Sequence, residues 1–148
     1  MGSESVFDMK SLIKKTLIIF CLLTFLVSCF QVETTNPDKA YSYWAGAKPP
    51  KDIQLINGEY YQSPHFTLEY ELFLEFKATE EWRQEFINYN DLKIDIQNED
   101  WSRFTKLPEW FKPNGNYKVY SRNDEYDRSR YFIEPKSGIC YIYETVGM

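Results

Sequence analysis

Alternating glutamates in the segment from His65 to Lys77 are the residues of this sequence best suited to acid–base chemistry. Side chains two residues apart on a strand lie about 6.5–7 Å apart on the same face. Glu69 and Glu71 can therefore flank a bond as an acid/base pair at the spacing of inverting glycosidases, with His65 nearby. The same alternation is typical of any solvent-facing strand, and no cleft-forming motif accompanies the pair. The sequence therefore favours a solvent-facing strand over an acid/base pair.

Metal chemistry and covalent catalysis have little support in the sequence. The chain has one histidine and, after residue 29, one cysteine, Cys140, which are too few for a usual zinc site. The acidic stretch 123–127 lacks the spacing and the glycine of a calcium loop, and it is interpreted as a solvated turn. Cys140 lies in an apolar strand pattern, so we interpret it as a core residue and not as a nucleophile.

Motifs for phosphate binding, dinucleotide binding and a serine nucleophile are also missing from the sequence. We therefore expect no enzyme activity, no catalytic residue, no metal and no cofactor. The formal net charge of −5 argues against a nucleic-acid partner, because neutralising phosphates needs a concentrated basic face.

Aromatic residues are unusually frequent, with 12 Tyr, 11 Phe and 4 Trp in 148 residues. Each buried ring can hide about 150–250 Å², so the rings can supply much of a core. We expect most of those between residues 101 and 126 to do so. Trp110 and Phe111 are the expected exceptions, because a proline lies on each side of them and loop aromatics often dominate binding. The predicted interaction surface consists of Trp110, Phe111, His65, Glu69 and Glu71.

The N-terminal segment has the order of parts of a secretory signal. Three lysines at positions 10, 14 and 15 precede the apolar stretch from Leu17 to Val27. Residues 16–30 would extend about 22 Å as a helix, which is too short to span a hydrocarbon core of roughly 30 Å comfortably. Acidic Glu4 ahead of the lysines is unusual for such a segment, so we expect the natural start to be Met9.

The end of this segment, Leu26-Val27-Ser28-Cys29, resembles the lipobox of bacterial lipoproteins. In that family, signal peptidase II cuts before the cysteine, whose thiol carries a diacylglycerol and whose freed amine is usually acylated, commonly with palmitate. The resemblance implies that residues 1–28 are a signal peptide and that Cys29 is the lipid attachment site. Two or three acyl chains hold a protein on a membrane essentially permanently. An ordinary secretory signal and an uncleaved anchor are the alternatives.

The resemblance also implies a location in the cell envelope. In enterobacterial lipoproteins, an aspartate directly after the lipidated cysteine retains the protein at the inner membrane. Phe30 occupies this position here, which favours the outer membrane where the host has one. The chain from Cys29 onward carries 14 basic and 20 acidic side chains, a net charge of −6, so we expect the lipid and not headgroup charge to hold it there.

The remaining sequence predicts one α+β domain. We expect a lipidated tether over residues 29–47, whose aromatics at 41–44 can dock back, and a folded domain over 48–148. A short strand with a turn at Asn57-Gly58 and a long alternating strand from Phe66 to Phe76 come first. One short helix over 79–89 and a strand over 92–96 follow. A C-terminal β-hairpin and meander uses strands at 117–120, 130–134 and 139–144. The predicted fold is a mainly antiparallel sheet with one short helix.

Three functions are compatible with these features. The first, which we expect, is a membrane-anchored envelope lipoprotein acting as a binding or interaction module, with a protein partner in the envelope. The second is a carrier of a small hydrophobic ligand, which would need a cavity lined by the even positions of the long strand. The third is a small envelope hydrolase using Glu69 and Glu71.

Overall fold

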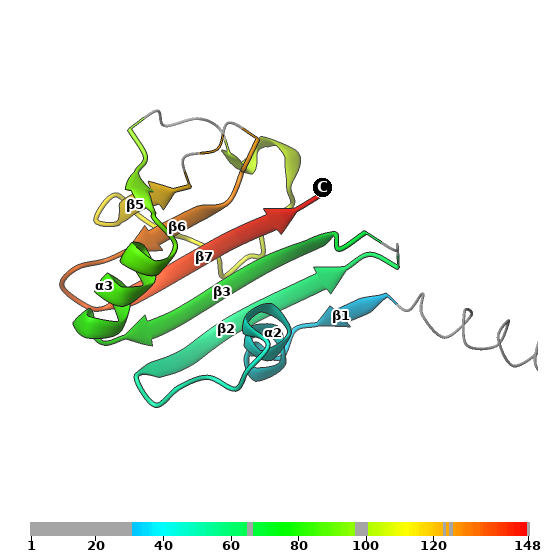
Figure 1. Ribbon diagram of the computed structural model, residues 1–148, viewed down its shortest axis with the longest axis horizontal. Helices are drawn as coiled ribbons and strands as arrows, with labels where there is room; N and C mark the ends of the chain where they lie inside the picture. Colours follow the sequence, from blue (N-terminus) through cyan, green and yellow to red (C-terminus); the bar gives the residue numbers. More distant parts are fainter. Residues whose placement is uncertain (1–30, 65–66, 97–100, 123, 125, 148) are drawn as a thin grey trace, which may run out of the picture.

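The computed structural model describes residues 31–64, 67–96, 101–122, 124 and 126–147. Within these residues, seven strands form one sheet in the order β1-β2-β3-β7-β6-β5-β4, and every neighbouring pair is antiparallel (Figure 1). The strands are β1 (Val32–Thr34), β2 (Ile53–Gln62), β3 (Tyr70–Ala78), β4 (Lys93–Ile94), β5 (Lys118–Ser121), β6 (Arg130–Ile133) and β7 (Ile139–Val146). The other elements are α2 (Pro37–Ala45), α3 (Glu80–Tyr89) and the 3₁₀ helix η1 (Trp101–Phe104). The predicted α+β class and the C-terminal meander are confirmed.

Strand β3 lies next to β7 near the middle of the sheet and separates two layers of side chains. Leu72, Leu74 and Phe76 are fully buried and face the helices. Phe73 belongs to a second buried cluster on the opposite face. The predicted period of two is therefore confirmed, although β3 begins at Tyr70 and the preceding Leu68 is 60% exposed.

Helix α3 forms where the sequence predicts a helix. Its N-cap is Thr79, whose hydroxyl accepts a hydrogen bond from the backbone N–H of Trp82 at 3.3 Å. Trp82 and Phe86, four residues apart on one side of the helix, stack with ring centroids 4.9 Å apart. Both rings pack on the sheet, Trp82 against Phe76 and Phe86 against Tyr131.

The segment that the sequence analysis assigned to a tether is folded, which corrects the predicted domain boundary. It contains β1 and a second helix, α2, in which Ala40 and Tyr41 are buried. The Asn36 side chain caps α2 by accepting from the Lys39 N–H at 2.9 Å, and Pro37 occupies the first helical position. Among the described residues, regular structure therefore begins at Val32 and not at residue 48, and two α-helices are present where one was expected.

The predicted turn at Asn57-Gly58 is also wrong. Strand β2 runs through both residues, with a register shift between Leu55 and Asn57 in its pairing with β3. A Cβ atom on Gly58 would lie 2.8 Å from the Cα of Pro37 and 2.9 Å from a methyl of Leu74. The glycine is thus required because α2 crosses β2 at this point, as Figure 1 shows.

An aromatic layer covers the face of the sheet opposite the helices. Phe111 is 3% exposed, and its ring contacts those of Phe73, Phe132 and Tyr141 at centroid distances of 5.2–6.0 Å. Trp101 packs on Phe132 and Tyr143 in the same layer. Among the rings expected to form core, Trp101, Tyr117 and Tyr120 are partly buried and pack against the two clusters, whereas Tyr126 is 85% exposed. Phe111 itself belongs to this core, which corrects its placement on an interaction surface.

Candidate functional site

A cleft of about 100 Å³ opens between the first three strands and the loop that precedes Trp110. Its polar lining consists mainly of Glu33 from β1, Glu59 and Tyr61 from β2, Glu71 from β3 and Lys106 from the loop. Ligand pockets for whole small molecules usually measure about 300–1,000 Å³. This cleft has the size for a side chain or a few waters.

Strand register brings the cleft side chains together. Tyr61 lies opposite Glu33 on one side and opposite Glu71 on the other. Residues directly opposite each other in antiparallel strands point to the same face, as do residues two apart. Glu59 therefore shares this face, which is the one opposite the helices.

The loop is fastened to the cleft by two hydrogen bonds to carboxylates. The indole Nε1 of Trp110 donates to Oε1 of Glu59 at 3.0 Å, and the hydroxyl of Thr105 donates to Glu71. A carboxylate can accept about four hydrogen bonds, so each retains capacity for a ligand. With three carboxylates and one ammonium group along its lining, the cleft favours cationic or neutral groups over anions.

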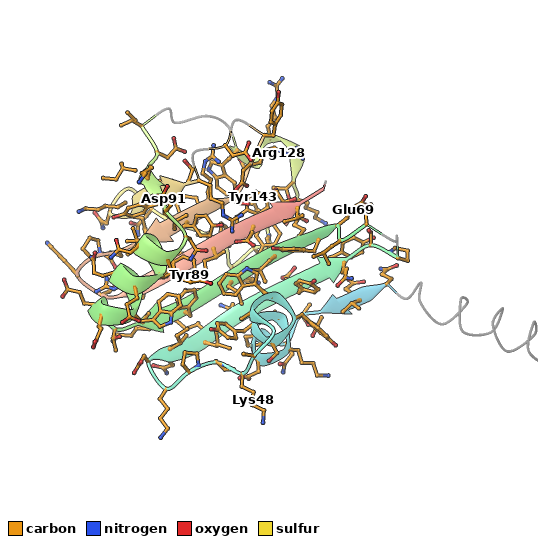
Figure 2. All side chains as sticks on the ribbon, in the orientation of Figure 1. Lys48, Glu69, Tyr89, Asp91, Arg128 and Tyr143 are labelled. Carbon is orange, nitrogen blue, oxygen red and sulfur yellow. The ribbon has the colours of Figure 1, made fainter. Side chains whose placement is uncertain are left out.

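The two glutamates that the sequence suggested as an acid and a base differ in their surroundings. Glu69 accepts hydrogen bonds from the hydroxyls of Ser63 at 3.1 Å and Thr67 at 2.8 Å. It lies at the end of β3 that is next to the start of β1 (Figure 2) and does not line the cleft. Glu71 lines the cleft. The two carboxylates therefore have different surroundings, and Glu69 does not line the cleft that Glu71 lines.

Of the other predicted site residues, one lies beside the cleft and two are outside the described part of the chain. Trp110 is half-buried at the cleft through its bond to Glu59. His65 and Cys29 lie outside the described residues. The sequence did not indicate Glu33, Glu59 or Tyr61 as site residues. Glu59 and Tyr61 are two residues apart on one face of β2, just as the lining residues Glu71 and Phe73 are on β3. The turn wrongly predicted at Asn57-Gly58 hid that alternation.

A second polar cluster lies on the helix face around Glu144, which is 3% exposed. Its Oε1 accepts from the Trp44 indole at 3.0 Å and from the Tyr70 hydroxyl. Its Oε2 accepts from the Tyr131 hydroxyl at 2.7 Å and from the Arg122 guanidinium at 3.0 Å. Four donors from four parts of the chain thus converge on one buried carboxylate.

The surroundings of Glu144 indicate a structural role. Burial, and then the adjacent carboxylate of Glu144, raise the pKa values of Tyr70 and Tyr131 far above the ordinary value for tyrosine. Both phenols therefore remain protonated donors. Because each carboxylate oxygen already has two partners, the cluster joins α2, β3, β6 and the end of β5.

Cys140 is buried in the helix-side core, where the sequence places it. Burial raises the pKa of its thiol to about 12, which suppresses the nucleophilic thiolate. Among the described residues, no group of three His, Cys, Asp or Glu side chains is arranged to hold a metal ion. In the same part of the chain, no helix is long and apolar enough to cross a membrane.

Comparison with protein-family models, with curated proteins and with solved structures found no match to this chain.

Proposed function

We propose that this protein is a lipid-anchored protein of the cell envelope, attached through acylated Cys29, whose folded body is a binding module. The observation that carries the proposal is the position of the lipobox relative to the fold. Cleavage before Cys29 leaves all seven described strands and both helices intact, because the first described element begins at Val32. The signal segment and the folded body are therefore adjacent but separable along the chain.

The filled core supports a surface binding role over a carrier role. A carrier would need a cavity lined by Leu72, Leu74 and Phe76, but all three are fully buried. They line none of the three described cavities. The cleft presents carboxylates and the Tyr61 phenol at the surface, where a basic group of a protein partner in the envelope could pair with the carboxylates.

Metabolic labelling with radioactive palmitate tests the anchor. The full chain, expressed in a bacterium that processes lipoproteins, should incorporate label, and Cys29→Ala should abolish both labelling and cleavage of the signal. Cys21→Ala is the matched control, because it removes a cysteine within the apolar stretch and should leave labelling unchanged. Undiminished labelling of the Cys29→Ala chain would refute the proposal.

Site-specific photocrosslinking in intact cells tests the binding face. A photoreactive residue replacing Tyr61 in the cleft should give a discrete crosslinked protein. The same residue replacing Gln84, exposed on α3, should not. A crosslink of equal yield at both positions, or none at position 61, would count against the cleft as the contact region.

A further inference from the structure

We infer that one end of the sheet, called here the tip, lies against the lipid bilayer. Its described residues are Gln31, Ser63, Pro64, Thr67, Leu68, Glu69 and Gly147. The inference rests on the lipid anchor proposed above, and it adds which surface of the body faces the membrane.

Strand pairing brings these residues to one end. Val32 lies opposite Gln62, Gln62 opposite Tyr70, and Tyr70 opposite Val146. The start of β1, the connection from β2 to β3 and the end of β7 therefore meet. Figure 1 shows this end of the sheet beside the point where the described chain begins.

The chain length from the anchor restricts where the tip can be. Two residues, Phe30 and Gln31, lie between Cys29 and Val32. The three Cα–Cα steps from Cys29 to Val32 span at most about 3.6 Å each in a fully extended chain, or about 11 Å in total. The headgroup layer on each side of a bilayer is roughly 5–8 Å thick. A lipidated Cys29 therefore holds the start of β1 within about 11 Å of the anchor, in the headgroup layer or just above it.

The opposite end of the sheet lies well away from this restraint. Strand β3 has nine residues, so its ends are about 27 Å apart at 3.3–3.4 Å per residue. Exposed charged side chains cluster at that end, including Lys51, Lys77, Glu80 and Lys136. Such groups are costly to remove from water, so this end is suited to the aqueous side.

The surface chemistry of the tip is different. Its exposed residues are Gln31, Pro64, Thr67, Leu68 and Gly147, and none of them has a charged side chain. Leu68 is the large apolar one, at 60% exposure. Glu69 is the one carboxylate, and it is half-buried and hydrogen-bonded to Ser63 and Thr67. The five exposed residues of the tip can therefore contact headgroups without desolvating a charged side chain of their own, and Leu68 gains by burying apolar surface in the interface. The nearest exposed carboxylate is that of Glu33, one residue into β1.

This orientation places the cleft close to the bilayer. Glu33, which lines the cleft, is the residue after Val32 in β1. A partner that reaches the cleft must then approach along the membrane surface.

Fluorophore labelling of the lipidated protein tests the orientation. Leu68→Cys at the tip and Lys136→Cys at the opposite end would each be labelled with an environment-sensitive dye. Native Cys140 is buried and should not react, and Cys29 is blocked by lipid. Both proteins would be reconstituted in phosphatidylcholine/phosphatidylglycerol vesicles that contain a lipid with a spin label at the headgroup.

The dye at position 68 should be quenched by the spin-labelled lipid at least twofold more than the dye at position 136, with emission shifted to the blue. Equal quenching at both positions, or stronger quenching at 136, would overturn the inference. Mass spectrometry of the same samples separates the two proposals. A lipidated Cys29 with equal quenching refutes the orientation alone, whereas an unmodified Cys29 refutes the anchor and the orientation together.

Discussion

The carboxylate of Glu144 illustrates how a buried charge can be held in this protein. Each oxygen has two donors, and the donors come from residues as distant in sequence as Trp44 and Tyr131. A buried carboxylate with all of its hydrogen-bond donors present stabilises the fold. If a poorer acceptor replaces it, some of the buried donors are left unsatisfied and the free energy of unfolding falls.

Glu144→Gln should therefore be strongly destabilising. The amide has one acceptor oxygen in place of two, and its NH₂ group would face existing donors. We expect the free energy of unfolding to fall by about 3–5 kcal/mol, measured by urea denaturation in mild detergent. Glu85→Gln, on the exposed side of α3, is the control and should change it by less than about 0.5 kcal/mol. A small effect at Glu144 would contradict its structural role.

Cys140 gives a prediction on reactivity. Burial raises the pKa of its thiol to about 12 from the ordinary value of 9.0, so the folded chain keeps the proton. At pH 8 the thiolate fraction should be about a thousandfold lower than in the unfolded chain. Alkylation of the peptide containing Cys140, followed by mass spectrometry, should be slow in native protein and fast in urea. Rapid alkylation of the native protein at pH 8 would show that the thiol is accessible.

Helix α2 and strand β2 fit together because position 58 has no side chain. Gly58→Ala would place a Cβ atom 2.8 Å from the backbone of Pro37 and 3.2 Å from the Cβ of Ala40. We expect a loss of about 1–3 kcal/mol in the free energy of unfolding and faster amide exchange in α2. Gly115→Ala is the matched control, since nothing lies within 4 Å of the added atom. If both variants were equally stable, α2 would not pack on β2 as described.

Some elements could be predicted from sequence because their signals are local. The alternation in β3, the Thr79 cap of α3 and the C-terminal strands are of this kind. The helix in the expected tether also has local signals, Asn36 and Pro37, but the polar residues before them, without an apolar period, are typical of a linker. Gly58 could not be interpreted locally, because its role depends on a helix that packs across β2.

The cleft could be predicted only in part. Glu71, which the alternation of its own strand indicates, lines the cleft. Trp110, which its flanking prolines indicate, adjoins the cleft through its hydrogen bond to Glu59. Glu33 and Glu59 reach the cleft through the pairing of β1 with β2 and of β2 with β3. Strand order and register are properties of the whole sheet, so residues brought together by them have no common signal in the sequence.

For the whole molecule, we propose attachment to the membrane through lipid on Cys29, three residues before the first described strand. A lipid at that position would fix both the location of the protein and the end of the sheet that meets the membrane. The bond between Cys29 and its lipid would then place the cleft close to the membrane and the charged end of the sheet away from it.

Intact-mass spectrometry of the protein extracted from membranes tests the proposed attachment. We expect a chain that begins at Cys29, with a mass equal to residues 29–148 plus a diacylglycerol and, on the amine, an acyl group. A chain beginning at any other residue, or beginning at Cys29 without added lipid, would contradict it.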